Sequence, residues 1–320
     1  MNNKYSFLLG AGASVPAGIP PLEQLYELYV ENLTKREIDL ISLMEDRFAK
    51  DDYNFNLKLL LKILNLFKEL DQEPIKSLFI NTDNELINNL DLVSTMIKKL
   101  KRLIRKECTV EKSNIDYLLP LRRFIYNIDS LQVFTLNYDL LIETLCELYQ
   151  INYTDGFRLT WQPDLLEDKS FDLRLYKLHG SSMWYETEDE RKLKIPVTNY
   201  DGKLEYFLGT ELSNLLVYPK KNSCEPFQKL LHYFGLHLLE TEILICIGYS
   251  FGDSLIKQQV LEGLKNNPQL HIYLVSPHAE QTLEEHFSCY KERITFFNLG
   301  IEEALADDFL YFKVHDFRNE

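Results

Sequence analysis

The sequence predicts an α/β protein with a Rossmann-like, doubly wound and mostly parallel sheet. Three observations lead to this fold class. Several short segments are almost continuously apolar, helical patterns separate them, and the apolar segments end abruptly in glycine or polar residues. Parallel strands covered on both faces have this pattern, because neither face is solvated. At 320 residues with 45% hydrophobic content, the chain can also bury one large core.

The first predicted strand covers residues 5–9 and runs directly into the glycines of a turn, Gly10 and Gly12. Pro16 and the pair Pro20 and Pro21 follow, and they delay the next helix until about residue 22. The chain is therefore expected to open with a strand, a loop and a helix.

Residues 22–128 are almost wholly helical in pattern and are interpreted as a helical insertion after the first strand. Apolar residues recur there at helical spacing, as at Leu57, Leu60, Leu61, Leu64 and Phe67. A cluster of basic residues in this stretch is interpreted as a solvated helix face: Lys98, Lys99, Lys101, Arg102, Arg105 and Lys106.

Short strands and helices alternate after the insertion. Strands are predicted over residues 131–136, 173–178, 242–247, 270–275 and 294–297, and a helix over residues 140–149. A stretch with few helical signals, about residues 185–218, is predicted to form a small lid lobe with a hairpin closed by Asp201 and Gly202. Residues 1–320 are expected to form one domain that carries the insertion and the lid lobe.

Composition narrows the class of protein. The formal net charge of −14 argues against direct nucleic-acid binding, because a polyanion would be repelled over most of the surface. The five cysteines form no C-x-x-C pair, so no metal site is expected, and the buried-looking Cys146 and Cys246 suit a reducing cytoplasm. No segment is long and apolar enough to suggest a signal peptide or a membrane span.

Two strand ends near the start of the sheet suggest a ligand site. Glycines at 10 and 12 would let bare backbone N–H groups approach a diphosphate, although small residues also occur in ordinary strand-to-helix turns. Asn137 and Asp139 follow the strand at residues 131–136, at the rim where ligands bind in open α/β sheets. Either residue could instead cap the helix from residue 140, or Asp139 could cap while Asn137 faces the ligand.

Three further strand ends carry polar residues. His179 follows the strand at residues 173–178, where a neutral imidazole could take a proton from water or a ribose hydroxyl near neutral pH. Ser250 and the adjacent amides could reach a phosphate, while Asp253 could hold a ribose hydroxyl or cap the next helix. Ser276 ends a later strand and could sit beside an adenosine.

Taken in order, the segments GAGAS, TLNYD, KLHGS, GYSFGD and VSP resemble the motif series of the sirtuin-like superfamily. The motifs NYD, HGSSMW and GYSFGD resemble those of bacterial sirtuin-like NAD hydrolases of antiphage defence more than those of protein deacylases. Two departures support this narrower resemblance: the chain lacks the D-F-R sequence that deacylases carry after the glycine loop, and it lacks their paired C-x-x-C zinc ligands.

The resemblance implies roles for individual residues. Asn137 would flank the nicotinamide and orient a water molecule, and His179 would be the general base. The other implied contacts to NAD, as substrate and without a metal, involve ten residues: Gly10, Ala11, Gly12, Ser14, Thr135, Asp139, Gly248, Ser250, Asp253 and Ser276.

The implied function is an NAD glycohydrolase that yields nicotinamide and ADP-ribose and depletes NAD in a regulated antiphage response, with abortive infection as the outcome. Such an activity would need restraint, so a homo-oligomer or a separate activating sensor protein is expected, with the helical insertion as the contact surface. Two alternatives stay open: an NAD-dependent protein deacylase, and a non-catalytic sensor that binds NAD or ADP-ribose.

Overall fold

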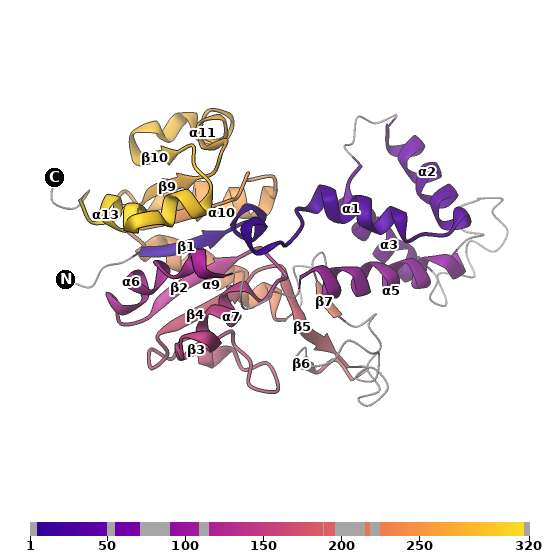
Figure 1. Cartoon of the computed structure of the whole chain (residues 1–320). Helices are drawn as coiled ribbons and strands as arrows, with labels where there is room; N and C mark the ends of the chain where they lie inside the picture. Colours follow the sequence, from indigo (N-terminus) through magenta and orange to yellow (C-terminus); the bar gives the residue numbers. More distant parts are fainter. Residues whose placement is uncertain are drawn as a thin grey trace. The chain divides into compact units, whose positions relative to one another are not determined.

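The computed structural model describes residues 5–49, 55–70, 90–108, 115–187, 189–195, 215–217 and 225–316. Its main feature is a seven-stranded sheet with the strand order β10-β9-β8-β1-β2-β4-β3 (Figure 1). The strands are β1 (Tyr5–Leu9), β2 (Leu131–Thr135), β3 (Tyr153–Thr154), β4 (Leu173–Lys177), β8 (Ile243–Ile247), β9 (His271–Val275) and β10 (Ile294–Phe297).

Every strand pair in this sheet is parallel, which confirms the predicted fold class. The predicted strands are all present, and β1 and β10 have the predicted bounds. The sequence reading missed β3, whose two residues are too few to show a pattern.

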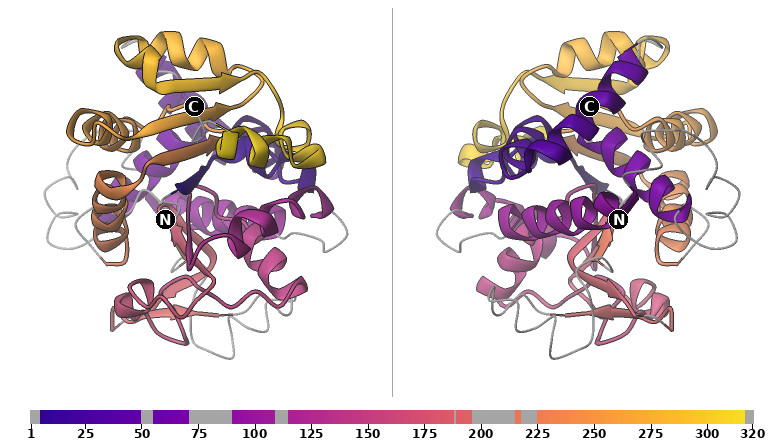
Figure 2. Two further views of the ribbon diagram at one scale, coloured as in Figure 1. Left: turned by 90° about the vertical axis from the view of Figure 1, so that its left-hand side faces the viewer. Right: turned by 90° about the vertical axis from the view of Figure 1, so that its right-hand side faces the viewer.

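The helices of the same unit follow or separate the strands. They are α6 (Leu121–Tyr126), α7 (Leu141–Leu148), α9 (Phe227–Glu240), α10 (Ser254–Asn266), α11 (Ala279–His286), α12 (Ile301–Leu305) and α13 (Phe309–Asp316). Figure 2 shows helices on both faces of the sheet, as a doubly wound fold requires.

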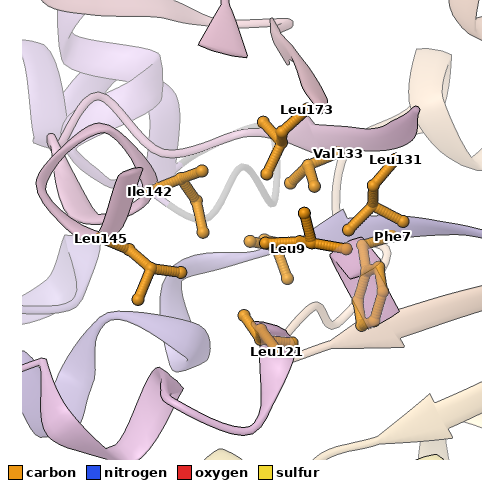
Figure 3. A pocket seen from close by; sticks show the side chains of 9 residues that line it. Phe7, Leu9, Leu121, Leu131, Val133, Ile142, Leu145 and Leu173 are labelled. Carbon is orange, nitrogen blue, oxygen red and sulfur yellow. The ribbon is translucent and has the colours of Figure 1, made fainter. Parts of the chain in front are cut away.

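Alternate residues of each central strand enter different layers of the core. Phe7 and Leu9 of β1 belong to one apolar cluster with Phe124 of α6. On the opposite face Phe134 of β2 packs against Phe234 of α9, with ring centroids 4.9 Å apart. A small void in the first cluster has a wholly apolar lining (Figure 3), so it belongs to the core and offers a polar ligand nothing to bind.

Contacts divide the chain into two compact units: residues 1–19, 109–196 and 216–320 form the unit of the sheet, and residues 20–108 and 197–215 form the second. The predicted helical insertion at about residues 22–128 therefore includes elements of both, since η5 (Asp116–Leu118) and α6 lie in the sheet unit. The second unit contains α1 (Leu22–Glu31), α2 (Lys35–Ala49), α3 (Leu57–Leu70) and α5 (Leu90–Glu107).

Polar contacts join the helices of the second unit. The Tyr29 hydroxyl of α1 donates to the carbonyl of Met96 in α5 at 3.0 Å, and Lys99 lies 2.6 Å from the buried Glu37 of α2. The interpretation of the basic cluster as a solvated face is wrong for Lys101 and Arg105, which are buried. Their long aliphatic stems can cover apolar surface, which a count of charges does not reveal.

A second sheet has the order β6-β5-β7, formed by β5 (Gly180–Glu186), β6 (Lys192–Lys194) and β7 (Leu215–Val217). The strand β5 begins directly after His179, where the sequence analysis predicted no strand. The predicted hairpin at Asp201 and Gly202 lies outside the described residues. Within the described ranges, no helix combines the length and apolarity needed to cross a bilayer.

Candidate functional site

The carboxyl ends of the parallel strands form one edge of the main sheet. From β1 the chain passes to β2 and β4 on one side and later to β8, β9 and β10 on the other. A topological switch point of this kind, here between β1 and β8, is the usual position of a ligand in an open α/β sheet. The predicted site residues end or follow the strands β1, β2, β4, β8 and β9, so all of them lie at this edge.

The turns after β1 and β8 pack closely against each other. The amides of Gly10 and Gly12 donate to the carbonyls of Ile247 and Gly248, both at 2.9 Å. Gly248 has a φ of +64°, and a Cβ there would lie 2.4 Å from the Ala13 nitrogen. A Cβ on Gly10 would lie 2.5 Å from the Gly248 carbonyl oxygen. The three glycines are therefore needed for the packing of one turn on the other.

This packing corrects the expectation of bare amides in the first turn. Besides Gly10 and Gly12, the amides of Ala13 and Ser14 donate to the carbonyls of Gly10 and Ala11, both at 3.0 Å. Three of the residues expected to face a diphosphate, Gly10, Gly12 and Ser14, thus already use their N–H groups on backbone acceptors. Ala11 and Gly12 are exposed, however, so the outer surface of the turn is accessible to a ligand.

Asn137 and Asp139 are tied to the first turn through Ser14. The Asn137 side-chain amide donates to the Gly10 carbonyl and to the Ser14 hydroxyl, both at 2.9 Å, and the Ser14 hydroxyl donates to Asp139 Oδ2 at 2.7 Å. Asp139 Oδ1 also accepts from the amide of Leu141 at the start of α7, at 3.0 Å. The expected division of roles holds in part: Asp139 binds the helix start, and Asn137 binds the glycine turn.

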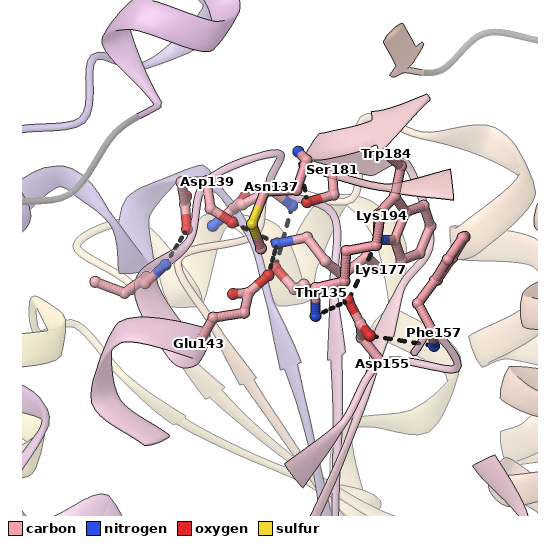
Figure 4. A network of polar contacts seen from close by, with 12 residues as sticks. Thr135, Asn137, Asp139, Glu143, Asp155, Phe157, Lys177, Ser181, Trp184 and Lys194 are labelled. Atoms are coloured by element: carbon pink, nitrogen blue, oxygen red, sulfur yellow. Dashed lines mark hydrogen bonds and ion pairs between the residues drawn. The ribbon is translucent and has the colours of Figure 1, made fainter. Parts of the chain in front are cut away.

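A buried lysine, Lys177, contacts the loop that carries Asn137 and Asp139 (Figure 4). Lys177, the last residue of β4, donates to the backbone carbonyl of Asp139 and forms an ion pair of 2.8 Å with Glu143 of α7. The sequence reading did not select Lys177. A lysine inside a strand that was expected to be buried was the available signal, since lysine is almost never fully buried unless it is paired.

His179 and Asp253 meet although they follow distant strands. The Nε2 atom of His179 lies 3.3 Å from Asp253 Oδ2, and the two side chains are 13% and 5% exposed. Asp253 Oδ1 accepts from the amides of Leu255 and Ile256, so this residue is the N-cap of α10, which confirms the capping alternative. Their pairing could not be predicted from local patterns, because 74 positions separate the two residues.

The remaining predicted residues are less closely joined to these groups. Thr135 is buried, and its hydroxyl accepts from the backbone N–H of Asn137 at 3.1 Å. Ser250 is exposed after β8, and the Ser276 hydroxyl accepts from the amide of His278 at 3.2 Å. In the described part of the chain, no three His, Cys, Asp or Glu side chains gather in a way that would hold a metal ion.

A known family matches residues 131–296, slightly more than half of the chain, and it is described as the SIR2-like domain. The chain belongs to the SIR2-like family. The matched segment runs from the first residue of β2 into β10 and contains Asn137, Asp139, His179 and Asp253. The glycine turn at residues 10–14 precedes it.

Solved structures similar to this SIR2-like protein have low sequence identity. Sir2Tm bound to a propionylated peptide is 13% identical, with a TM-score of 0.48, and the match covers 98% of this chain and 94% of that one. A Sir2 homolog in complex with NAD is 14% identical with a TM-score of 0.48, covering 98% and 90% of the two chains. No curated protein matches the chain in sequence.

Proposed function

We propose that this SIR2-like protein is an NAD glycohydrolase that cleaves NAD to nicotinamide and ADP-ribose. One observation carries the proposal: at the switch point of the sheet, Asn137 is bound directly to the glycine turn that follows β1. This arrangement joins a side chain able to orient water to the turn that would face the diphosphate. Membership of the SIR2-like family supports NAD as the substrate.

The turns after β1 and β8 would receive the dinucleotide. The exposed residues Ala11, Gly12 and Ser250 would approach the phosphates, and Ser276, directly after β9, would lie toward the adenosine. Because the amides of Gly10, Gly12 and Ser14 already have backbone acceptors, the phosphates would bind to other backbone N–H groups of the two turns and to the Ser250 hydroxyl. An acidic protein can therefore bind NAD at this edge without a cluster of cationic side chains.

The reaction needs positioning more than covalent help. When the bond between ribose C1′ and the nicotinamide nitrogen breaks, nicotinamide leaves with the bonding electrons as a neutral molecule. A water oxygen then bonds to C1′, and its proton passes to His179 as general base. Asn137 would orient that water, and exclusion of other solvent would favour the ribosyl cation.

A free NAD hydrolase would deplete its own cell, so we place this activity in a regulated response. The proposed role is an NAD-depleting effector of antiphage defence in the bacterial cytoplasm, restrained until a homo-oligomer or a separate sensor protein activates it. The helical stretch of residues 22–128 is the proposed contact surface, because no strand of the main sheet lies among its described residues.

A product assay tests the proposal. The purified chain is incubated with NAD, with and without cell extract as a source of activator, and products are separated by chromatography. We expect nicotinamide and ADP-ribose in equal amounts, and their loss in His179→Ala and Asn137→Ala variants that keep the wild-type circular dichroism spectrum. Acyl-ADP-ribose formed from an acylated peptide would indicate a deacylase instead, and NAD binding without any turnover would indicate a sensor.

A further inference from the structure

His179 and Asp253 approach each other across the carboxyl ends of β1 and β2. His179 follows β4 and Asp253 follows β8, and the strand order places β1 and β2 between them. Three interstrand spacings of about 4.8 Å separate β4 from β8 by roughly 14 Å. A contact of 3.3 Å therefore requires the two loops to approach each other across the ends of β1 and β2. The pair lies at the edge where the glycine turn and Asn137 begin.

The carboxylate of Asp253 is held in a fixed orientation. Its Oδ1 atom accepts from the amides of Leu255 and Ile256 in the first turn of α10, at 3.0 and 3.3 Å. The Oδ2 atom is thereby directed toward His179, and only 5% of the side chain is exposed. A carboxylate fixed by a helix start can hold an imidazole in one ring orientation and one tautomer.

We propose that Asp253 is the positioning residue of His179, which deepens the proposed function and rests on it. A neutral imidazole that directs its Nε2 proton to Asp253 carries its lone pair on Nδ1, and that atom then accepts the proton of the attacking water. Asp253 also stabilises the imidazolium that forms. This role replaces the earlier expectation of a contact between Asp253 and a ribose hydroxyl.

The first test is Asp253→Asn. Asparagine caps helices about as well as aspartate, so Oδ1 can still accept from Leu255 and Ile256. The amide would present an N–H group to Nε2 and favour the wrong tautomer of His179. We expect kcat for NAD to fall roughly 100-fold or more, the scale of general base catalysis, while KM changes little. Asp253→Ser should give the same result, because the serine hydroxyl can still accept from the helix amides but is too short to hold His179.

A double-mutant cycle decides whether Asp253 acts through His179. Adding Asp253→Asn to His179→Ala should leave the residual rate of nicotinamide release unchanged, because no imidazole remains to be oriented. An equal loss in both backgrounds would mean that Asp253 contacts the substrate itself, and this would overturn the inference. Ser254→Ala is the matched control, since Ser254 is exposed beside Asp253 and its loss should leave kcat unchanged.

The failure of this inference differs from failure of the proposed function. If His179→Ala turns over NAD at the wild-type rate, the proposed base is wrong and the role of Asp253 fails with it. If His179→Ala is inactive but both Asp253 variants retain the wild-type kcat, only the positioning role is overturned. Circular dichroism and thermal melting of each variant show that these comparisons are made on folded protein.

Discussion

Lys177 Nζ lies 2.8 Å from Glu143 Oε1, and the two side chains are only 1% and 2% exposed. Lys177 also donates to the Asp139 carbonyl, so the ion pair joins β4 and α7 to the loop that carries Asn137. Burial raises the pKa of Glu143, and the charge of Lys177 opposes that rise. The second oxygen of Glu143 has no hydrogen-bond partner among the described residues. The stability of the folded protein therefore depends strongly on Lys177, because Glu143 is buried and Lys177 is its partner.

Removing one partner of this pair should be costly. We expect Lys177→Met to lower the free energy of unfolding by about 3 to 5 kcal/mol, because Glu143 would stay buried without its cation. The change is measured by urea denaturation followed by fluorescence. In the double variant Lys177→Met with Glu143→Leu, most of the lost stability should return, since a buried ion pair can be replaced by apolar side chains at little cost. Equal stability of the single and double variants would contradict the dependence of Glu143 on Lys177.

The packing of the two glycine turns gives a second prediction. Gly248→Ala should destabilise the protein and abolish NAD turnover, because φ is +64° there and the new Cβ would lie 2.4 Å from the Ala13 nitrogen. Gly252→Ala is the matched control from the same turn, where the nearest atom to a new Cβ is the Ser250 hydroxyl at 3.8 Å. Thermal melting and the product assay separate the two variants. A Gly248→Ala protein with the stability and turnover of Gly252→Ala would disprove this account of the turn.

Ser14 gives a third prediction, because its hydroxyl joins Asn137 to Asp139. We expect Ser14→Ala to reduce kcat about tenfold, equivalent to about 1.4 kcal/mol, since of its two side-chain hydrogen bonds described here Asn137 would keep the one to Gly10. Steady-state NAD turnover measures the effect. Ser6→Ala is the control: Ser6 is also buried in or beside β1, but its hydroxyl contacts Thr241 near the amino end of the sheet. The role assigned to Ser14 is rejected if both variants turn over NAD equally fast.

The sequence predicted the sheet well because buried parallel strands are marked locally. Each of β1, β2, β4, β8, β9 and β10 is a short, mostly apolar run followed by a turn signal, so the residues within and just after each strand are enough to find it. The strand β5 was missed because the residues after His179 include glycine and two serines, which are typical of loops. Pairing with β6 and β7 overrides that local preference.

The candidate site was predictable in its members but not in its contacts. Parallel strand ends must share one edge, so Asn137, His179 and Asp253 could be grouped from their positions after strands. The bond from Ser14 to Asp139 and the pair of His179 with Asp253 depend on how loops fold over that edge. The amides of Gly10 and Gly12 donate to carbonyls at the end of the neighbouring strand β8. These bonds could not be predicted locally, because β8 is more than 200 residues away in the sequence.

The pH dependence of stability provides a fourth prediction, through His237. Burial, with a smaller effect of the Arg174 charge, lowers the pKa of His237 from 6.5 to about 4. Its Nε2 atom contacts the Tyr176 hydroxyl at 3.1 Å, and that hydroxyl donates to the Leu166 carbonyl. Below pH 6.5 this histidine is protonated in the unfolded chain, whereas in the folded chain it stays neutral until the pH falls to about 4. Stability should therefore fall as the pH drops through this window, by up to about 3 kcal/mol from this residue.

His237→Gln tests this assignment, because glutamine can keep a hydrogen bond to Tyr176 but does not titrate. The free energy of unfolding is measured by urea denaturation at intervals from pH 7 to pH 4. We expect the variant to lose less stability than the wild type over this range. Some acid sensitivity should remain, since burial also lowers the pKa of His271 to about 4. If wild type and variant lose stability in parallel, His237 binds its proton equally well in the folded and unfolded states, and the assignment of the acid sensitivity to its burial is wrong.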